Sequence, residues 1–330
     1  MTRPQHCAAI ALIGGLLLLT YGAHLWQAGW VYEDALWTTG AQSWLGPRGL
    51  SVATWGLTPT PQAAHALSLA LYAGLLGLVW AFARQLGISR LGAYAIAALL
   101  AVHPIASEAV AYAASRAELL AAIGVIGACL VVSVPRMPWR WLAVVVSLVF
   151  GLGGKESALV AVLLVPLTCV AVGRLHWTRA VAGLVVASLV LSSTVDVQAL
   201  INWGEAPQLQ VSALDWISAQ SAAAYRLIGV AISGMGMTID ADIDLLTMTA
   251  QRVAAGALAL LALVAILLRR TQPLLAFGLA WCLISLLPRL IVQTPRSYLN
   301  EHQFLIPLIG LTIGGVGAWE GWAALKAAPR

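Results

Sequence analysis

Apolar runs recur from one end of the chain to the other, separated by short gaps that are polar or contain Pro or Gly. Most runs approach the roughly 20 residues that a helix needs to cross the hydrocarbon core of a bilayer. Division at the gaps predicts helices at residues 8–27, 65–84, 91–104, 117–134, 140–153, 157–173, 179–195, 252–268, 273–288 and 303–324. The pattern therefore predicts an all-α integral membrane protein, a polytopic bundle of about ten transmembrane helices.

Two longer segments interrupt this pattern. Residues 27–64 form the predicted first outer loop. Residues 195–251 have weak hydropathy and predict a second outer loop, with an amphipathic interfacial helix near 219–235 that lies on the membrane or is partly inserted. Neither segment marks a domain boundary, so residues 1–330 are expected to form a single membrane domain.

Composition supports a membrane location and excludes other classes of protein. Hydrophobic side chains make up 61% of the 330 residues and charged ones only 9%, against about 25% charged residues in soluble proteins. The net charge is +5, but Lys and Arg are scattered in ones and twos between apolar runs rather than clustered. Nucleic acid is therefore not an expected partner.

The distribution of basic residues predicts the orientation, because short connections rich in Lys and Arg remain in the cytoplasm. One set of alternate connections and ends carries Arg3, Arg84, Arg90, Arg136, Arg140, Arg174, Arg179, Arg269, Arg270, Lys326 and Arg330. We assign this side, with both termini, to the cytoplasm of a multi-pass protein of the cell (inner) membrane. Every acidic residue except Glu320 falls on the opposite face, where we expect the site, facing the periplasm or the cell exterior.

Other basic residues fall on the acidic face, against the tendency of the rule. They are Arg48, Arg116, Lys155, Arg226, Arg252, Arg289 and Arg296. Ionisable groups near membrane depth usually pair with one another or line a cavity. The mixture therefore indicates either an outward-facing polar cavity or ordinary loop solvation with structural ion pairs.

Two segments carry candidate chemistry. The first outer loop contains the adjacent carboxylates Glu33 and Asp34, just past a membrane helix. A second segment runs from His103 to Ala122, with the sequence HPIASEAVAYAASRAELLAA. By itself, this second segment is also explained as a capped connector with an internal Glu–Arg pair.

The second segment resembles the block HPI-x-x-EAV-x-x-x-x-x-R-x-(D/E)-LLAA of the TMTC-like family of membrane O-mannosyltransferases, which are GT-C type glycosyltransferases. Further segments resemble blocks of that family in the same order and together cover about residues 30–315. They are Gly154-Lys155-Glu156-Ser157, Gln220 to Tyr225, Thr238 to Asp242, Pro273 to Trp281 and Asn300 to Pro307. Gln303 stands where family members typically have Arg, and the tetratricopeptide repeats of the family are absent from this sequence.

The resemblance implies a GT-C bundle that moves a monosaccharide, with mannose as one candidate, from a polyprenyl-phosphate carrier to a hydroxyl acceptor such as a protein Ser or Thr. It implies no cofactor beyond this lipid-linked donor, and as partners the lipid carrier and a protein acceptor or a partner membrane subunit. Asp34 is the first choice as catalytic base, with Glu33 next, while Lys155 and Arg116 are the candidates for the donor phosphate. The other residues in matching blocks are His103, Glu108, Glu118, Glu156, Tyr225, Asp240, Asp242, Glu301 and His302.

This chemistry needs few groups. A phosphate leaves the anomeric carbon without protonation if cations stabilise its charge, and one base must accept the proton of the attacking hydroxyl. Each candidate also has a plainer interpretation. Lys155 and Arg116 would pair with Glu156 and Glu118, and His103 and His302 would be structural hydrogen-bonders.

The sequence leaves both the presence of a metal and the function open. Asp240 and Asp242 are candidate ligands for a divalent metal, although an isolated D-x-D pair more often belongs to a loop. The competing functions are a catalytically inactive GT-C-like membrane subunit or scaffold of a larger complex, and a transporter or flippase.

Overall fold

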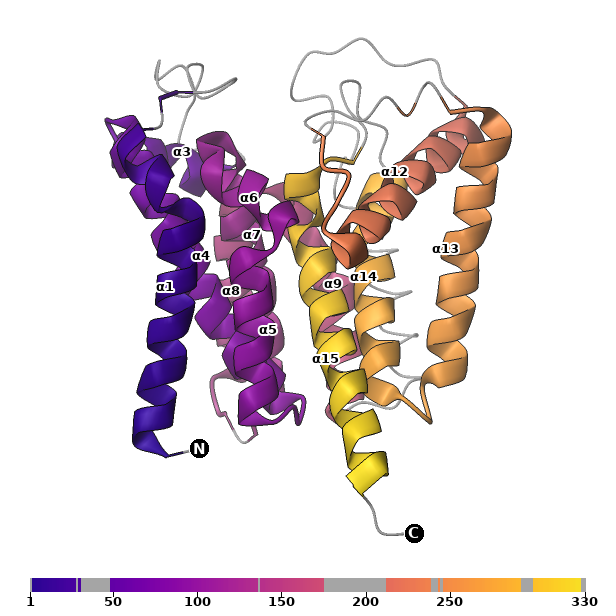
Figure 1. Ribbon diagram of the computed structural model, residues 1–330. Helices are drawn as coiled ribbons and strands as arrows, with labels where there is room; N and C mark the ends of the chain where they lie inside the picture. Colours follow the sequence, from indigo (N-terminus) through magenta and orange to yellow (C-terminus); the bar gives the residue numbers. More distant parts are fainter. Residues whose placement is uncertain are drawn as a thin grey trace.

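The computed structural model describes residues 2–27, 29–30, 48–135, 137–174, 212–238, 243, 246–291 and 299–327. Regular structure in these residues is entirely helical, which confirms the all-α fold. Most of the long helices stand side by side as a bundle, and α1 begins at the same end of it as α15 ends (Figure 1).

The first half of the chain supplies a group of helices centred on α7, which packs against α4, α8 and α9. The elements are α1 (Arg3–Gln27), α3 (Gly49–Gly56), α4 (Pro61–Gln85), α5 (Arg90–Val102), α6 (Pro104–Ala111), η1 (Ala113–Ser115), α7 (Arg116–Ser133) and α8 (Arg140–Gly154). The rest of the chain supplies η2 (Glu156–Val160), α9 (Ala161–Ala171), α12 (Ala213–Ser233), α13 (Met248–Leu268), α14 (Pro273–Ile291), η5 (Glu301–Phe304) and α15 (Leu305–Ala327).

Within the described residues, six helical segments are long and apolar enough to cross a membrane, which is consistent with a multi-pass membrane protein. They are Arg3–Ala23, Pro61–Gln85, Ala113–Ser133, Met248–Leu268, Pro273–Leu290 and Glu301–Ala327. The pair α5 and α6, bent by 64° at its break, makes a seventh if counted as one span. Arg140–Gly154 and Glu156–Ala171 are shorter, and the predicted helix at 179–195 lies outside the described residues, so ten spans remain a prediction.

Glycines let two helix pairs approach closely. A Cβ atom added to Gly278 on α14 would lie 2.6 Å from the Cα of Gly314 on α15. On α7, a Cβ at Gly124 would lie 2.6 Å from the backbone nitrogen of Gly151 on α8. Small residues at such contacts are typical of helices in membranes, where packing rather than hydrophobic burial holds neighbours together.

The helix predicted near 219–235 is present but starts earlier, because Ser212 caps α12 by accepting the backbone N–H of Asp215 (3.2 Å). It ends at Gly234, whose φ of +70° suits glycine. Figure 1 shows α12 tilted relative to α13, with its C-terminal end toward α14 and α15. It is not among the six segments that meet the criteria for a span.

The two ends of the bundle differ in charge as the sequence predicts. The end of the bundle where α1 begins and α15 ends also holds the turns between α4 and α5, α7 and α8, and α13 and α14 (Figure 1). Basic residues lie in these turns or at the adjoining helix ends: Arg84, Arg90, Arg140, Arg269 and Arg270. The opposite end holds α3, α6 and η5, and it is there that the described acidic side chains of the candidate site gather.

Candidate functional site

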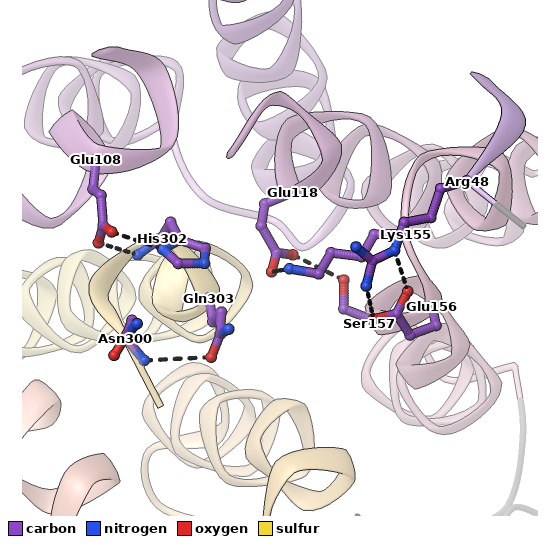
Figure 2. Close-up of polar contacts among 9 residues, drawn as sticks. All are labelled: Arg48, Glu108, Glu118, Lys155, Glu156, Ser157, Asn300, His302 and Gln303. Carbon is purple, nitrogen blue, oxygen red and sulfur yellow. Dashed lines mark hydrogen bonds and ion pairs between the residues drawn. The ribbon is translucent and has the colours of Figure 1, made fainter. Parts of the chain in front are cut away.

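The junction of α8 and η2 places a lysine against a buried carboxylate. Gly154 packs so closely on α7 that an added Cβ would lie 2.5 Å from the Cβ of Leu120. The following residue, Lys155, donates from Nζ to Oε1 of Glu118 (2.7 Å), and Oγ of Ser157 donates to Oε2 of the same carboxylate (2.8 Å; Figure 2). The side chains of Lys155 and Glu118 are only 12% and 4% exposed. This contact is therefore a buried ion pair with both carboxylate oxygens bonded.

A second ion pair lies beside the first. Nε and Nη2 of Arg48 donate to the two carboxylate oxygens of Glu156, at 2.8 and 2.5 Å. Although burial raises the pKa of Glu156, the hydrogen bond and charge of Arg48, together with the charge of Lys155, lower that pKa to about 2. Glu156 therefore stays ionised at physiological pH. We call the five residues Arg48, Glu118, Lys155, Glu156 and Ser157 the Lys155 cluster.

These pairs correct the plainer interpretation of the sequence, which paired Lys155 with Glu156 and Arg116 with Glu118. The structure pairs Lys155 with Glu118, and Glu156 with Arg48. Residues one or two apart do not face each other at a helix end, so partners come from other elements.

Arg116 begins α7 and has no exposed surface. Its guanidinium lies 4.8 Å from the ring centroid of Trp55. Nη1 donates to the carbonyl of Thr54 (3.2 Å) and to Oγ1 of Thr58 (3.3 Å). Arg116 thus anchors α3 and the residues after it to the start of α7, by hydrogen bonds and a cation–π contact.

Across from the Lys155 cluster, Glu108 on α6 holds His302 in η5 at two points. Oε2 of Glu108 accepts the backbone N–H of His302 (2.9 Å), and Oε1 bonds to Nδ1 of the imidazole ring (2.8 Å). Figure 2 shows His302 with Glu108 on one side and the Lys155 cluster on the other. We call Glu108 and His302 the Glu108–His302 dyad.

The neighbours of His302 in η5 also hold fixed positions. Glu301, 2% exposed, accepts from Nη2 of Arg226 (2.9 Å) and from the backbone N–H of Thr238 (3.2 Å), which ties the end of α12 to η5. The side chain of Gln303 accepts the backbone N–H of Asn300 (3.3 Å) and completes a capping box (Figure 2). Gln303 therefore has a structural task in this chain.

His103 uses both ring nitrogens. Nδ1 accepts the backbone N–H of Ile105 (3.2 Å), and Nε2 bonds to the carbonyl oxygen of Ala231 (3.0 Å). These bonds fix the break between α5 and α6 and dock it on α12. His103 is thus a structural hydrogen-bonder, the plainer of its two interpretations.

The structure brings together most of the described candidates, since Glu108, Glu118, Lys155, Glu156 and His302 lie in the cluster and the dyad. Tyr225, by contrast, is 52% exposed on α12. Glu33, Asp34, Asp240 and Asp242 lie outside the described residues. In the part of the chain that the structure describes, no group of three or more His, Cys, Asp or Glu could hold a metal ion.

Two residues of the site carry no predicted role in the sequence. For Arg48, the only indication in the sequence is its position as a basic residue on the predicted acidic face. Ser157 lies within the matched Gly154-Lys155-Glu156-Ser157 block, but no role follows from its type or spacing. In the structure each is a hydrogen-bond donor to a carboxylate.

An apolar groove of about 820 Å³ runs between α5, α12 and α15. Ser89 and Glu320 line it toward the end of the bundle that carries the termini, and His103 and Ala231 line it toward the opposite end. The groove thus leads along the bundle toward α6, which carries Glu108.

Comparisons of the chain with protein-family models, with curated proteins and with solved structures found no match.

Proposed function

We propose that the chain is a GT-C type glycosyltransferase that moves a monosaccharide from a polyprenyl-phosphate carrier to a hydroxyl acceptor at the outer face of the membrane. The observation that carries the proposal is the meeting of the Lys155 cluster and the Glu108–His302 dyad at one end of a membrane bundle. Paired charges and an oriented imidazole near lipid are typical of a site that handles a charged substrate. The proposed reaction class, sugar transfer, comes from the resemblance of the sequence blocks, in their order, to those of GT-C type glycosyltransferases.

Lys155 is the preferred contact for the donor phosphate. Its ammonium nitrogen lies 2.7 Å from Oε1 of Glu118. A bound phosphate would accept a further hydrogen bond from the same ammonium group. Arg116 is the second candidate, but its contacts with Thr54, Trp55 and Thr58 favour a role in holding α3. A cation in a low-dielectric setting stabilises the charge that develops on a leaving phosphate without giving up a proton.

The carrier's isoprenoid chain needs an apolar path beside the site. The groove between α5, α12 and α15 offers one, since it is largely apolar and leads toward α6. For the base, the resemblance implies Asp34, with Glu33 next. Among the described residues, the imidazole of His302 is a further candidate.

Two competing functions each have an observation in their favour. A catalytically inactive scaffold is favoured by Gln303, which caps η5 in place of the expected cation. A transporter or flippase is favoured by the 64° break between α5 and α6, because transporters build substrate sites from broken helices. The charged residues of the cluster lie at one end of the bundle rather than at mid-depth, which favours the transferase.

The test uses the purified full chain in lipid nanodiscs with radiolabelled polyprenyl-phosphate mannose, and it measures bound lipid and glycosylated product separately. Wild type is expected to bind the carrier and to label Ser- or Thr-containing membrane proteins of its host. Lys155→Met should weaken carrier binding, since an unneutralised phosphate near lipid is costly. Arg252→Met, which removes an exposed cation of α13 away from the cluster, is the matched control and should bind as wild type does.

The outcomes separate the three functions. Binding without any transfer would establish the scaffold. Movement of the labelled lipid between the leaflets of a proteoliposome, without product, would establish the flippase. Wild-type protein that binds no carrier would overturn the donor site itself.

A further inference from the structure

We propose that His302, oriented by Glu108, accepts the proton of the attacking hydroxyl and so acts as a general base. This inference rests on the proposed function. It assigns a catalytic role to His302 and a positioning role to Glu108, neither of which the resemblance supplies.

The contacts of Glu108 decide which ring nitrogen of His302 carries the proton. An ionised carboxylate only accepts hydrogen bonds, so the 2.8 Å contact with Oε1 requires a proton on Nδ1. The neutral ring then has its lone pair on Nε2. The second contact, from the backbone N–H of His302 to Oε2, ties the ring and its own backbone to one carboxylate and limits rotation of the ring.

Nε2 of His302 is left for a substrate. Within the described part of the chain it makes no hydrogen bond, whereas His103 of the same protein uses both of its nitrogens for the fold. The His302 side chain is 14% exposed, so it is neither sealed in the core nor freely solvated. A base whose other nitrogen is held by a third group is the usual arrangement for activating a hydroxyl.

Charged groups from several elements lie around the ring. Glu108 of α6 and Glu118 of α7 lie on its two sides, Lys155 after α8 partly neutralises Glu118, and Arg226 of α12 neutralises Glu301 of η5. An imidazolium formed during the reaction therefore faces a carboxylate that is already bonded to it, and its charge is stabilised where the dielectric constant is low.

The step balances without any further reactant. The acceptor oxygen forms a bond to the anomeric carbon of the sugar, while the bond from that carbon to the phosphate oxygen breaks and its electron pair leaves with the polyprenyl phosphate. The hydroxyl proton moves to Nε2 of His302 and is then released to water. Lys155, bonded to Glu118 on the side away from His302 (Figure 2), can offset the charge of the leaving phosphate.

The first experiment compares His302→Ala, His302→Gln and Asp34→Asn in the nanodisc assay, with carrier binding measured for each. The His302 variants are expected to lose transfer by about 10² to 10⁴, the range for loss of a general base, while still binding carrier. Added imidazole should restore part of the transfer in His302→Ala and none in Asp34→Asn. Transfer by either His302 variant at the wild-type rate, or rescue confined to Asp34→Asn, would overturn the inference.

The second experiment measures the protonation state of the His302 ring by ¹⁵N NMR and does not depend on transferase activity. In ¹⁵N-histidine-labelled protein, the His302 signals, assigned by their loss in His302→Gln, should show the form protonated on Nδ1. Glu108→Gln should shift this population toward the other tautomer and lower transfer by about 10- to 100-fold, the range seen for carboxylates that orient metal-bound histidines. A wild-type ring protonated on Nε2 would rule out the dyad, whereas absent carrier binding with the expected tautomer would reject the proposed function instead.

Discussion

Glu320 on α15 accepts a hydrogen bond from the backbone N–H of Ser89, the residue that caps α5, with 3.0 Å between nitrogen and oxygen. The Ser89 hydroxyl donates to the same carboxylate and accepts the backbone N–H of Gly92 (3.0 Å). Glu320 is the one acidic residue that the charge pattern left at the basic end of the bundle. Its negative charge at the N-terminus of α5 is favourable, and the contact joins the last helix to an early one.

Glu320 and Gly92 are expected to be coupled, because a Cβ on Gly92 would collide with the Glu320 carboxylate. Gly92→Ala and Glu320→Ala should each lower stability by about 0.5–2 kcal/mol, as losing a helix cap does. The double variant should cost clearly less than the sum, since both changes break one contact. Denaturant unfolding of the wild type, the two single variants and the double variant in detergent measures this double-mutant cycle. Gly77→Ala on α4, where an added Cβ meets nothing within 4 Å, is the control, and strict additivity would contradict the contact.

The buried ion pair of Lys155 and Glu118 can be tested by a second double-mutant cycle. Lys155→Met removes the ion-pair partner of the buried Glu118 carboxylate and should lower the free energy of unfolding by about 3–5 kcal/mol. Adding Glu118→Gln removes the charge that has lost this partner and should recover much of that loss. Glu156→Gln, in a pair whose side chains are 33% and 44% exposed, should cost only about 1 kcal/mol. Equal losses for the two pairs would show that the first is not buried in the membrane protein.

Close helix contacts predict which glycines tolerate substitution. Gly278→Leu should separate α14 from α15, because the added Cβ alone would lie 2.6 Å from the Cα of Gly314. A loss of more than about 3 kcal/mol, or no folded protein, is expected from overpacking at a backbone contact. Gly256→Leu on α13, with nothing within 4 Å of its added Cβ, should stay near wild type. The thermal unfolding midpoints of the two variants in detergent provide the comparison.

Apolar runs bounded by charged residues or proline predicted the helices well. The helix predicted at 140–153 is observed as Arg140–Gly154, and that at 273–288 as Pro273–Ile291. The helix predicted at 91–104 was only partly right, since α5 ends at Val102 and α6 starts at Pro104. Proline lacks an N–H and disfavours the helical conformation in the residue before it, so His103 breaks the helix.

The sequence indicated which residues belong to the site, but not which of them contact one another. The contacts that define it join residues 37, 108 and 194 positions apart in the sequence. Periodicity and local motifs carry no information on contacts between residues so far apart in the sequence. The sequence therefore suggested only pairs of nearby residues. The fixed tautomer of His302 depends on one oxygen of Glu108, which only the folded chain brings near.

The last prediction concerns orientation, on which the location of the site depends. In a Cys7→Ser background, Leu57→Cys and Thr271→Cys place one thiol at each end of the bundle, both at exposed positions. An impermeant maleimide added to intact cells should label residue 57 and should reach residue 271 only after permeabilisation, because the turn at 271 follows Arg269 and Arg270 and positive connections stay inside. Labelling of residue 271 alone would place the Lys155 cluster and the Glu108–His302 dyad in the cytoplasm, and would reject transfer at the outer face.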